Sequence, residues 1–319
     1  MGKKAEMDKP DKKEQGDGLE MINMEDIGKK RKRKKTPFDY IRYGIMLVSA
    51  IVFVVAGYQL YSIFHEYSKG EKAYEDVADN FTKKEESTGP AANSGAAAEN
   101  GGFAKVNVDF ASLQQQNPDV KGWIQFEGIS EINYPILQHP SDNNFYLKKM
   151  YNKEENTAGS IFMDIANQSN FQDYNTFIYG HNMKNLSMFG RLKEYKDQAF
   201  YQGKEFFWIY TPEANYRYQI FSMHEVKVSS GYFRTFETMG EEYTAYVNSC
   251  KEDSRYDTGV PVSGEDRIVT LSTCTAAGDN WRFLVHGKLI AVENKNAADG
   301  SGVPEEIPQE VVPIEAVPE

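Results

Sequence analysis

The residues that decide the fold lie near the C-terminal end, in Asp266-Arg-Ile-Val-Thr-Leu-Ser-Thr-Cys274 and Arg282-Phe-Leu-Val-His-Gly-Lys-Leu-Ile290. Both stretches are apolar and rich in β-branched residues, and a polar segment separates them. This pattern predicts two neighbouring strands joined by a loop. Antiparallel pairing would place Cys274 beside Arg282. Because a guanidinium favours the thiolate and can hold an oxyanion, the pair predicts a nucleophilic site.

A nucleophilic cysteine also needs a group that carries its proton. Of the 5 histidines, His181 ends the short apolar run that starts at Asn175, and a polar loop follows it. This is a common position for a catalytic side chain. His286 is a rival, because strand alternation places it on the same face as Arg282. It lies about 13 Å along the strand from Arg282, however, which is far for two groups that share one reacting atom.

Three alternatives to catalysis apply to these residues. Cys274 could be a buried packing residue, or it could form a disulfide with Cys250. The chain has only 2 cysteines, too few for a disulfide-built fold but enough for one bridge outside the cell. Cys250 falls inside a predicted helix, where a packing role is expected. Arg282 could be an ordinary surface arginine at the start of a strand.

The N-terminal part of the chain predicts a membrane anchor. Residues 1–42 form a basic tail with a run of lysines and arginines at 29–35, and residues 43–64 are almost wholly apolar. A spanning helix needs ~20 such residues. A cleavable signal peptide has a shorter apolar region of ~7–15 residues, so we predict an uncleaved signal anchor. The basic tail predicts a cytoplasmic N-terminus and an extracellular domain after the anchor.

The remaining chain divides into three parts by composition. Residues 65–105 are charged and then rich in Ala, Gly, Ser and Asn, which predicts a stalk and flexible linker. Residues 106–292 carry the periodicity of a globular domain, and residues 293–319 form an acidic, Pro-rich tail that we expect to be disordered. The net charge is −11, and the basic excess is confined to the N-terminal tail. An acidic main domain argues against nucleic acid as its ligand.

The globular domain is predicted to be mainly β. Gly, Pro, Asn and Asp separate eight short strand-like runs, a pattern typical of a closed barrel or a sandwich. Helical spacing is expected over residues 108–116 and 238–252. The strand-like runs are 122–126, 132–138, 159–164, 176–181, 206–211, 216–228, 267–274 and 282–292.

Several of these motifs resemble those of one family. Thr270-Leu-Ser-Thr-Cys274, Arg282 and Tyr179-Gly-His181 are similar to the signature of the sortases, membrane-anchored cysteine transpeptidases of Gram-positive bacteria. Asn117-Pro-Asp-Val-Lys-Gly-Trp123 and Gly159-Ser-Ile-Phe-Met-Asp164 resemble class B in particular. The likeness runs from about residue 106 to about residue 292. It implies an eight-stranded β-barrel with peripheral helices, one of them at residues 238–252, and neither a cofactor nor a metal.

The resemblance also implies a reaction and its residues. Cys274 would be the nucleophile, His181 the general acid and base, and Arg282 the oxyanion stabiliser. The substrate would be a secreted protein with an Asn-Pro-x-Thr-like sorting signal near its C-terminus, cleaved after Thr through a thioacyl enzyme. A peptidoglycan precursor would supply the acceptor amine. The residues expected to line the substrate groove are Asn143, Leu147, Tyr179, Tyr232, Phe233 and Ser272.

Some class B relatives carry an acidic residue just after the catalytic cysteine. Here Thr275 and Ala276 follow it, so a role for Asp279 beside His181 stays open.

Three other functions remain compatible with the sequence. A cysteine peptidase that only hydrolyses would use the same residues, and only its product would differ. A pilus-type sortase polymerase would use a lysine of another protein as the acceptor. A binding module on the same barrel would carry a structural Cys250–Cys274 bridge, and thiol titration of the unfolded, unreduced protein would then find no free thiol.

Overall fold

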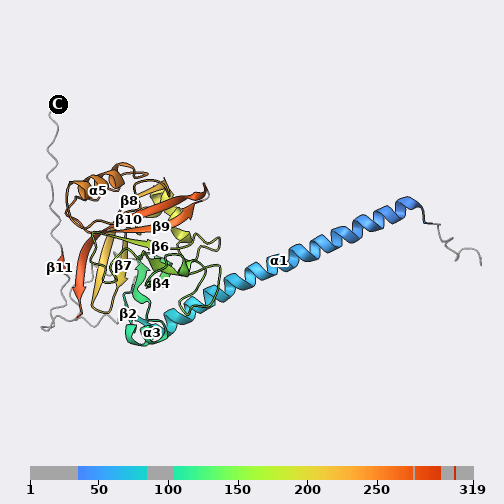
Figure 1. Cartoon of the computed structure of the whole chain (residues 1–319), viewed down its shortest axis with the longest axis horizontal. Helices are drawn as coiled ribbons and strands as arrows, with labels where there is room; N and C mark the ends of the chain where they lie inside the picture. Colours follow the sequence, from blue (N-terminus) through green and yellow to red (C-terminus); the bar gives the residue numbers. More distant parts are fainter. Residues whose placement is uncertain (1–34, 85–103, 276, 296–304, 307–319) are drawn as a thin grey trace, which may run out of the picture. The chain divides into compact units, whose positions relative to one another are not determined.

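A computed structural model describes residues 35–84, 104–275, 277–295 and 305–306, and its main feature is a closed β-barrel (Figure 1). Eight of the described strands form a ring in the order β10-β8-β7-β3-β4-β5-β6-β9, and β9 pairs back with β10. The predicted eight-stranded barrel is therefore confirmed. Its strands are β3 (Val120–Phe126), β4 (Ile129–Leu137), β5 (Ile161–Met163), β6 (Asn175–Tyr179), β7 (Phe206–Tyr210), β8 (Ala214–Lys227), β9 (Ile268–Thr275) and β10 (Gly278–Asn294).

Most neighbouring strands are antiparallel, but two pairs are parallel. These are β4 with β5 and β6 with β9. In the second pair Tyr179 lies opposite Ser272, near the C-terminal end of each strand. Since parallel strands end at the same edge of a sheet, the residues that follow β6 lie beside the last residues of β9.

The barrel is filled by alternate side chains of its strands. On β9, Val269 and Leu271 belong to the main hydrophobic cluster and are fully buried. The residues between and after them, Thr270 and Ser272, therefore lie on the outer face of the same strand. This alternation leaves a row of polar side chains on the outside of β9, ending at Cys274.

A helix covers part of this outer face. It is α5 (Glu241–Glu252), and Figure 1 shows it beside β8 and β10. It corresponds to the helix expected over 238–252. Its buried side chains pack against Phe221 and Ile268 of the barrel, so this outer surface is a second core. The buried residues of the helix are Tyr243, Tyr246, Val247 and Cys250.

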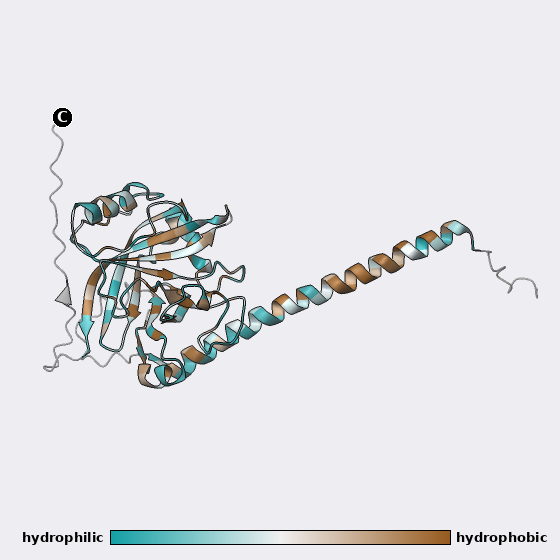
Figure 2. Cartoon of the chain, in the orientation of Figure 1, coloured by the Kyte–Doolittle hydropathy of each residue, from teal (hydrophilic) through white to brown (hydrophobic). Residues whose placement is uncertain are grey.

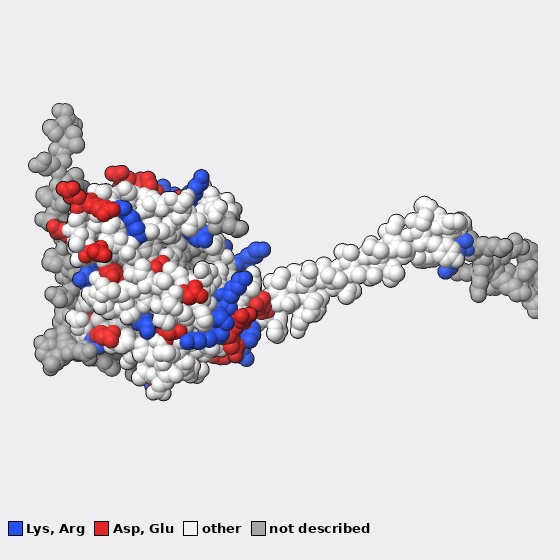
Figure 3. Space-filling model, in the orientation of Figure 1, with Lys and Arg blue, Asp and Glu red and all other residues white. Residues whose placement is uncertain are grey.

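The N-terminal helix α1 (Pro37–Phe81) begins with a long apolar band. Among the described residues it is the one helix whose length and composition suit a membrane crossing. Figure 2 shows the band in brown, and Figure 3 shows it without acidic or basic side chains. Its apolar side chains, from Tyr43 to Phe64, are mostly exposed. Exposed apolar side chains over such a length are what a hydrocarbon environment requires.

The last turns of α1 pack against the barrel. Gly70, Tyr74 and Val77 are buried there, and β1 (Thr82–Lys84) pairs with β2 (Val106–Val108). The spacing i, i+4 and i+7 places the three buried residues on one face of the helix. The segment expected to be a spacer, 65–105, thus contains packed residues as far as Phe81 and a paired strand as far as Lys84, whereas residues 85–103 lie outside the described part.

Short elements complete the described structure. Asp109 caps α3 by accepting a hydrogen bond from the Ser112 amide at 3.0 Å, which is a common way to satisfy a helix N-terminus. Of the tail expected over 293–319, residues 296–304 and 307–319 lie outside the described part. The short elements are α3 (Phe110–Gln116), η2 (Phe145–Leu147), η3 (Gly190–Lys196), α4 (Gln198–Tyr201) and β11 (Glu305–Glu306), which pairs with β10.

Candidate active site

Cys274 and Arg282 lie directly opposite each other on β9 and β10. Opposed residues of an antiparallel pair have Cβ atoms about 5 Å apart on the same face of the sheet. The expected hairpin therefore places the thiol and the guanidinium together. Both side chains are partly exposed, and the Arg282 guanidinium also donates to the Trp281 carbonyl at 3.0 Å.

His181 reaches the same edge from β6. The Gly180 amide donates to the Ser272 carbonyl at 3.1 Å, which extends the pairing of β6 with β9 by one residue. Glycine is required at this position, since a Cβ on Gly180 would lie 2.5 Å from Ile161 Cδ1 and 2.7 Å from the Phe189 ring. Such distances are impossible in a packed core. Close packing of the strand end therefore explains the glycine that precedes His181.

The imidazole of His181 is held by a backbone carbonyl. Nε2 lies 2.7 Å from the Leu147 oxygen, and because a carbonyl can only accept, Nε2 carries the hydrogen and donates. Gly159 permits this arrangement, since its φ is +58° and a Cβ there would lie 2.5 Å from the same Leu147 oxygen. The contact fixes the tautomer and leaves Nδ1 as the nitrogen that can exchange a proton.

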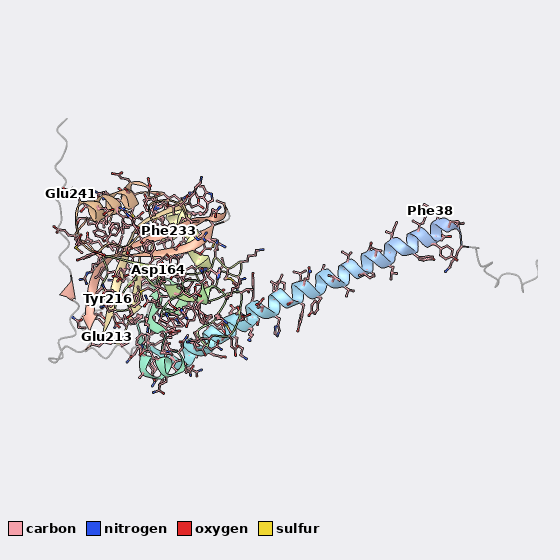
Figure 4. All side chains as sticks on the ribbon, viewed as in Figure 1. Phe38, Asp164, Glu213, Tyr216, Phe233 and Glu241 are labelled. Atoms are coloured by element: carbon pink, nitrogen blue, oxygen red, sulfur yellow. The ribbon has the colours of Figure 1, made fainter. Side chains whose placement is uncertain are left out.

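These three residues line one cavity of about 320 Å³. Five of the six predicted groove residues line it with them, and Figure 4 labels one of these, Phe233. The hydroxyls of Ser272 and Thr273 are buried in its wall and have no hydrogen-bond partner among the described residues. A few polar side chains in an otherwise largely apolar lining are suited to anchoring an extended ligand. The full lining is Asn143, Asn144, Leu147, Phe162, Tyr179, Gly180, His181, Val228, Phe233, Ser272, Thr273, Cys274 and Arg282.

Asp164, labelled in Figure 4, fixes two polar residues of the cavity wall. Its Oδ2 accepts from the Tyr179 hydroxyl at 2.8 Å and from Asn143 Nδ2 at 3.0 Å. Burial, together with the negative charge of Asp164, raises the pKa of the Tyr179 hydroxyl, which therefore stays protonated. Sequence reasoning placed Asp164 in a class B motif but gave it no role.

Tyr232 lies outside this cavity, unlike its neighbour Phe233. Its hydroxyl donates to the Ser249 carbonyl at 3.2 Å and contacts the carboxylate of Asp253. Its ring lies 4.6 Å from that of His224. The structure therefore directs Tyr232 toward α5, although the sequence reading assigned both neighbours to the groove.

The rival candidates are buried away from the cavity. His286 is 0 % exposed, and burial lowers its pKa well below the usual range, so the ring is neutral. Cys250 is also 0 % exposed, and burial raises the pKa of its thiol, which favours the inert protonated form. Both cysteines are free thiols, which contradicts the alternative of a Cys250–Cys274 bridge. The side chain of Asp279 lies outside the described part.

In the part of the chain that the structure describes, no group of three or more His, Cys, Asp or Glu residues is placed to hold a metal ion.

Asn182 is a site residue that sequence reasoning missed. Its Nδ2 donates to the Cys274 carbonyl at 2.9 Å, so the residue after His181 ties the histidine loop to the end of β9. Asn182 directly follows the Tyr179-Gly-His181 motif in the sequence. Its role depends on β6 lying beside β9, which the residue pattern does not reveal.

Replacing Asn182 with Ala is expected to lower kcat about tenfold and to leave KM nearly unchanged. The variant removes a tether between the two chemical groups without touching the peptide-binding walls, and a small misplacement of reacting groups costs rate. Steady-state kinetics on a sorting peptide measures both constants. Asn185→Ala is the matched control, because the Asn185 side chain accepts hydrogen bonds from Ser187 within its own loop. Equal losses in the two variants would contradict the positioning role of Asn182.

The fold and the sequence match known proteins. A family model described as the Sortase domain matches residues 124–290. Sortase B of Listeria monocytogenes is 34% identical over 253 residues, which cover 79% of this chain and 97% of that protein. A Bacillus anthracis sortase B structure has a TM-score of 0.58 at 34% identity and covers 71% of this chain and 99% of that one. A Staphylococcus aureus sortase B–substrate complex has a TM-score of 0.53 at 35% identity, covering 57% of this chain and 84% of that one.

A closed barrel of this topology, with cysteine, histidine and arginine at one cavity, is the fold of a transpeptidase of the sortase type. The chain belongs to the sortase family, and the relatives that it matches here are class B enzymes.

Proposed function

We propose that this class B sortase cleaves sorting signals after Thr through a thioester on Cys274 and transfers the product to a cell-wall amine. The observation that carries the proposal is the convergence of three elements. Strands β9 and β10 pair Cys274 with Arg282, and the parallel neighbour β6 brings His181 to the same cavity.

In the first half of the reaction, the Cys274 thiolate attacks the carbonyl carbon of the Thr residue. The carbonyl electrons move to oxygen, and the Arg282 guanidinium stabilises this oxyanion. When the tetrahedral intermediate collapses, the C–N bond breaks and His181 gives a proton to the leaving amine. The products are a thioester on Cys274 and the released C-terminal fragment.

In the second half, an acceptor amine attacks the thioester carbonyl. His181 now accepts a proton from the attacking nitrogen, Arg282 again stabilises the oxyanion, and the C–S bond breaks. Cys274 returns as the thiolate, and the secreted protein is joined to the acceptor through a new amide bond. The amine of a peptidoglycan precursor is the proposed acceptor. Each step uses groups of this chain and its two substrates.

The cavity supports a peptide with a short polar and apolar pattern. Its lining includes the apolar side chains of Leu147, Phe162 and Phe233, and the Asp164-bound pair Asn143 and Tyr179 forms a polar part. An extended peptide needs apolar contacts with a few fixed polar anchors. We infer an Asn-Pro-x-Thr-like signal on secreted proteins as the substrate.

The proposed location follows from the apolar segment of α1 and the basic tail that precedes it. The apolar residues 43–64 of α1 would cross the membrane once, and the basic tail within residues 1–42 would stay in the cytoplasm. The catalytic domain, residues 106–292, would then act outside the cell, where exported proteins and cell-wall precursors meet.

The test uses the full-length protein in detergent micelles with a quenched fluorescent Asn-Pro-x-Thr-type peptide. Mass spectrometry would identify the products with and without an added amine. We expect cleavage after Thr and an amide adduct when the amine is present. Free acid in both conditions would support the hydrolase alternative, and transfer only to a protein lysine would support the pilus-type polymerase. Failure to cleave any member of a peptide library would contradict the proposal.

A further inference from the structure

One wall of the substrate cavity is an irregular loop, residues 228–240, between β8 and α5. The loop contributes Val228 and Phe233 to the cavity, and the Phe233 ring stacks on Phe177 of β6 with centroids 6.0 Å apart. Most of its other residues are exposed. Exposed loops have low local stability, so whatever fixes this one also determines the shape of the cavity.

Helix α5 supplies the loop's main attachments. Arg234 forms an ion pair with Glu242 at 2.7 Å, but the two side chains are 42% and 75% exposed. Exposed pairs of this kind contribute little. The Tyr246 hydroxyl, by contrast, donates to the Tyr232 carbonyl at 3.0 Å from a side chain that is only 4 % exposed. Tyr232 is the immediate neighbour of Phe233.

The same hydroxyl also joins the loop to the barrel. Tyr246 accepts a hydrogen bond from Asn175 Nδ2 at 3.1 Å, and Asn175 Oδ1 accepts from Thr270 at 2.8 Å. Since the Thr270 proton is used there, His286 Nδ1 donates to the Thr270 oxygen, at 3.0 Å. The donors all run in one direction, from β10 through β9, β6 and α5 to the loop. These buried hydrogen bonds link the loop through α5 to three strands of the barrel and restrict its motion.

We propose that Tyr246 is a positioning residue of the peptide cavity, because its hydroxyl connects the loop that carries Phe233 to the outer face of the barrel. The inference rests on the proposed function, since it assigns loop 228–240 to the binding of the sorting peptide. Without the hydroxyl, the loop leaves its binding-competent position more often. The apparent affinity for the peptide falls in proportion to the fraction of molecules whose loop is in the binding-competent position.

The helix offers a matched control in Tyr243. This residue lies one turn earlier on α5, is 1 % exposed, and donates its hydroxyl to the Tyr174 carbonyl at 2.8 Å. It also contacts the Asp266 carbonyl. Both acceptors lie outside loop 228–240. Removing either tyrosine hydroxyl thus breaks a buried hydrogen bond from the same helix, but only one of the two bonds reaches the loop.

The experiment compares Tyr246→Phe with Tyr243→Phe in the full-length protein. Hydrogen–deuterium exchange of residues 228–240 and the kinetics of peptide cleavage are measured on both. We expect exchange in the loop to accelerate about tenfold in Tyr246→Phe alone. We also expect KM to rise at least about twofold, because the binding-competent fraction of the loop falls. The value of kcat should stay within about twofold of the wild type, because the reacting groups are untouched.

Several results would overturn this inference. The loop could exchange equally fast in the two variants, or KM could rise equally in both. In the third case, the loop of Tyr246→Phe would exchange faster while its KM stayed unchanged. A wild-type protein that cleaves no sorting peptide would instead contradict the proposed function. The exchange comparison would still decide whether Tyr246 anchors the loop, so the two failures are distinguishable.

Discussion

Replacing Cys274 with Ala is expected to abolish peptide cleavage and amine transfer together, with kcat/KM falling by about 10⁴-fold or more. A methyl side chain cannot form the thioester, so both halves of the reaction lose their covalent intermediate. Arg282 and His181 remain in place in the variant, because their positions depend on the backbone pairing of β10 and β6 with β9. The cleavage assay on the quenched peptide measures the loss.

Cys250→Ala is the matched control for this variant. It removes the other thiol of the chain, which lies on the buried face of α5 and outside the cavity. We expect it to lower the free energy of unfolding by about 1 kcal/mol and to leave kcat/KM within about twofold of the wild type. Comparable losses of activity in both variants, or substantial activity in Cys274→Ala, would contradict the assignment of the nucleophile.

Replacing Tyr74 with Ala is expected to lower the free energy of unfolding by about 3–5 kcal/mol. Tyr74 is 3 % exposed, meets Tyr134 edge-on at 5.3 Å between ring centroids, and donates its hydroxyl to the Gly159 carbonyl at 2.7 Å. The variant therefore leaves both a cavity and an unpaired buried carbonyl. Chemical denaturation of the full-length protein, followed by tryptophan fluorescence, measures the change.

The same substitution is expected to lower kcat, because Gly159 also supports the histidine. Gly159 packs on the Leu147 carbonyl, which accepts the hydrogen bond from His181. Lys72→Ala, on an exposed position of the same helix, should change neither stability nor rate by a measurable amount. If Tyr74→Ala were as stable as Lys72→Ala, the last turns of α1 would be a spacer and not part of the catalytic fold.

The barrel strands could be predicted from sequence because alternation and turn residues are local signals. The Cys274–Arg282 pair could also be predicted, since a short hairpin connection determines which residues face each other. The position of His181 beside Cys274 could not be predicted from local signals alone. It depends on the parallel pairing of β6 with β9, whose sequences lie far apart, and the family resemblance supplied it.

Other features depended on tertiary contacts that leave only a weak trace in the sequence. Tyr74 and Val77 lie among charged residues, and the segment around them has the composition of a spacer. The sequence therefore did not predict that the two residues share a buried helix face. Asp164 acts through the side chains that it holds. Tyr232 and Phe233 are neighbours in an irregular loop, where no periodicity predicts which of them faces the cavity.

The most direct test of the central claim is intact-mass analysis of the full-length protein mixed with a sorting peptide in the absence of an acceptor amine. The mechanism predicts a protein heavier by the N-terminal peptide fragment less one water, with the added mass on the segment that contains Cys274. Hydroxylamine should release it as a hydroxamate, which identifies a thioester. Cleavage without this adduct under rapid quenching, or the same adduct on Cys274→Ala, would contradict the account.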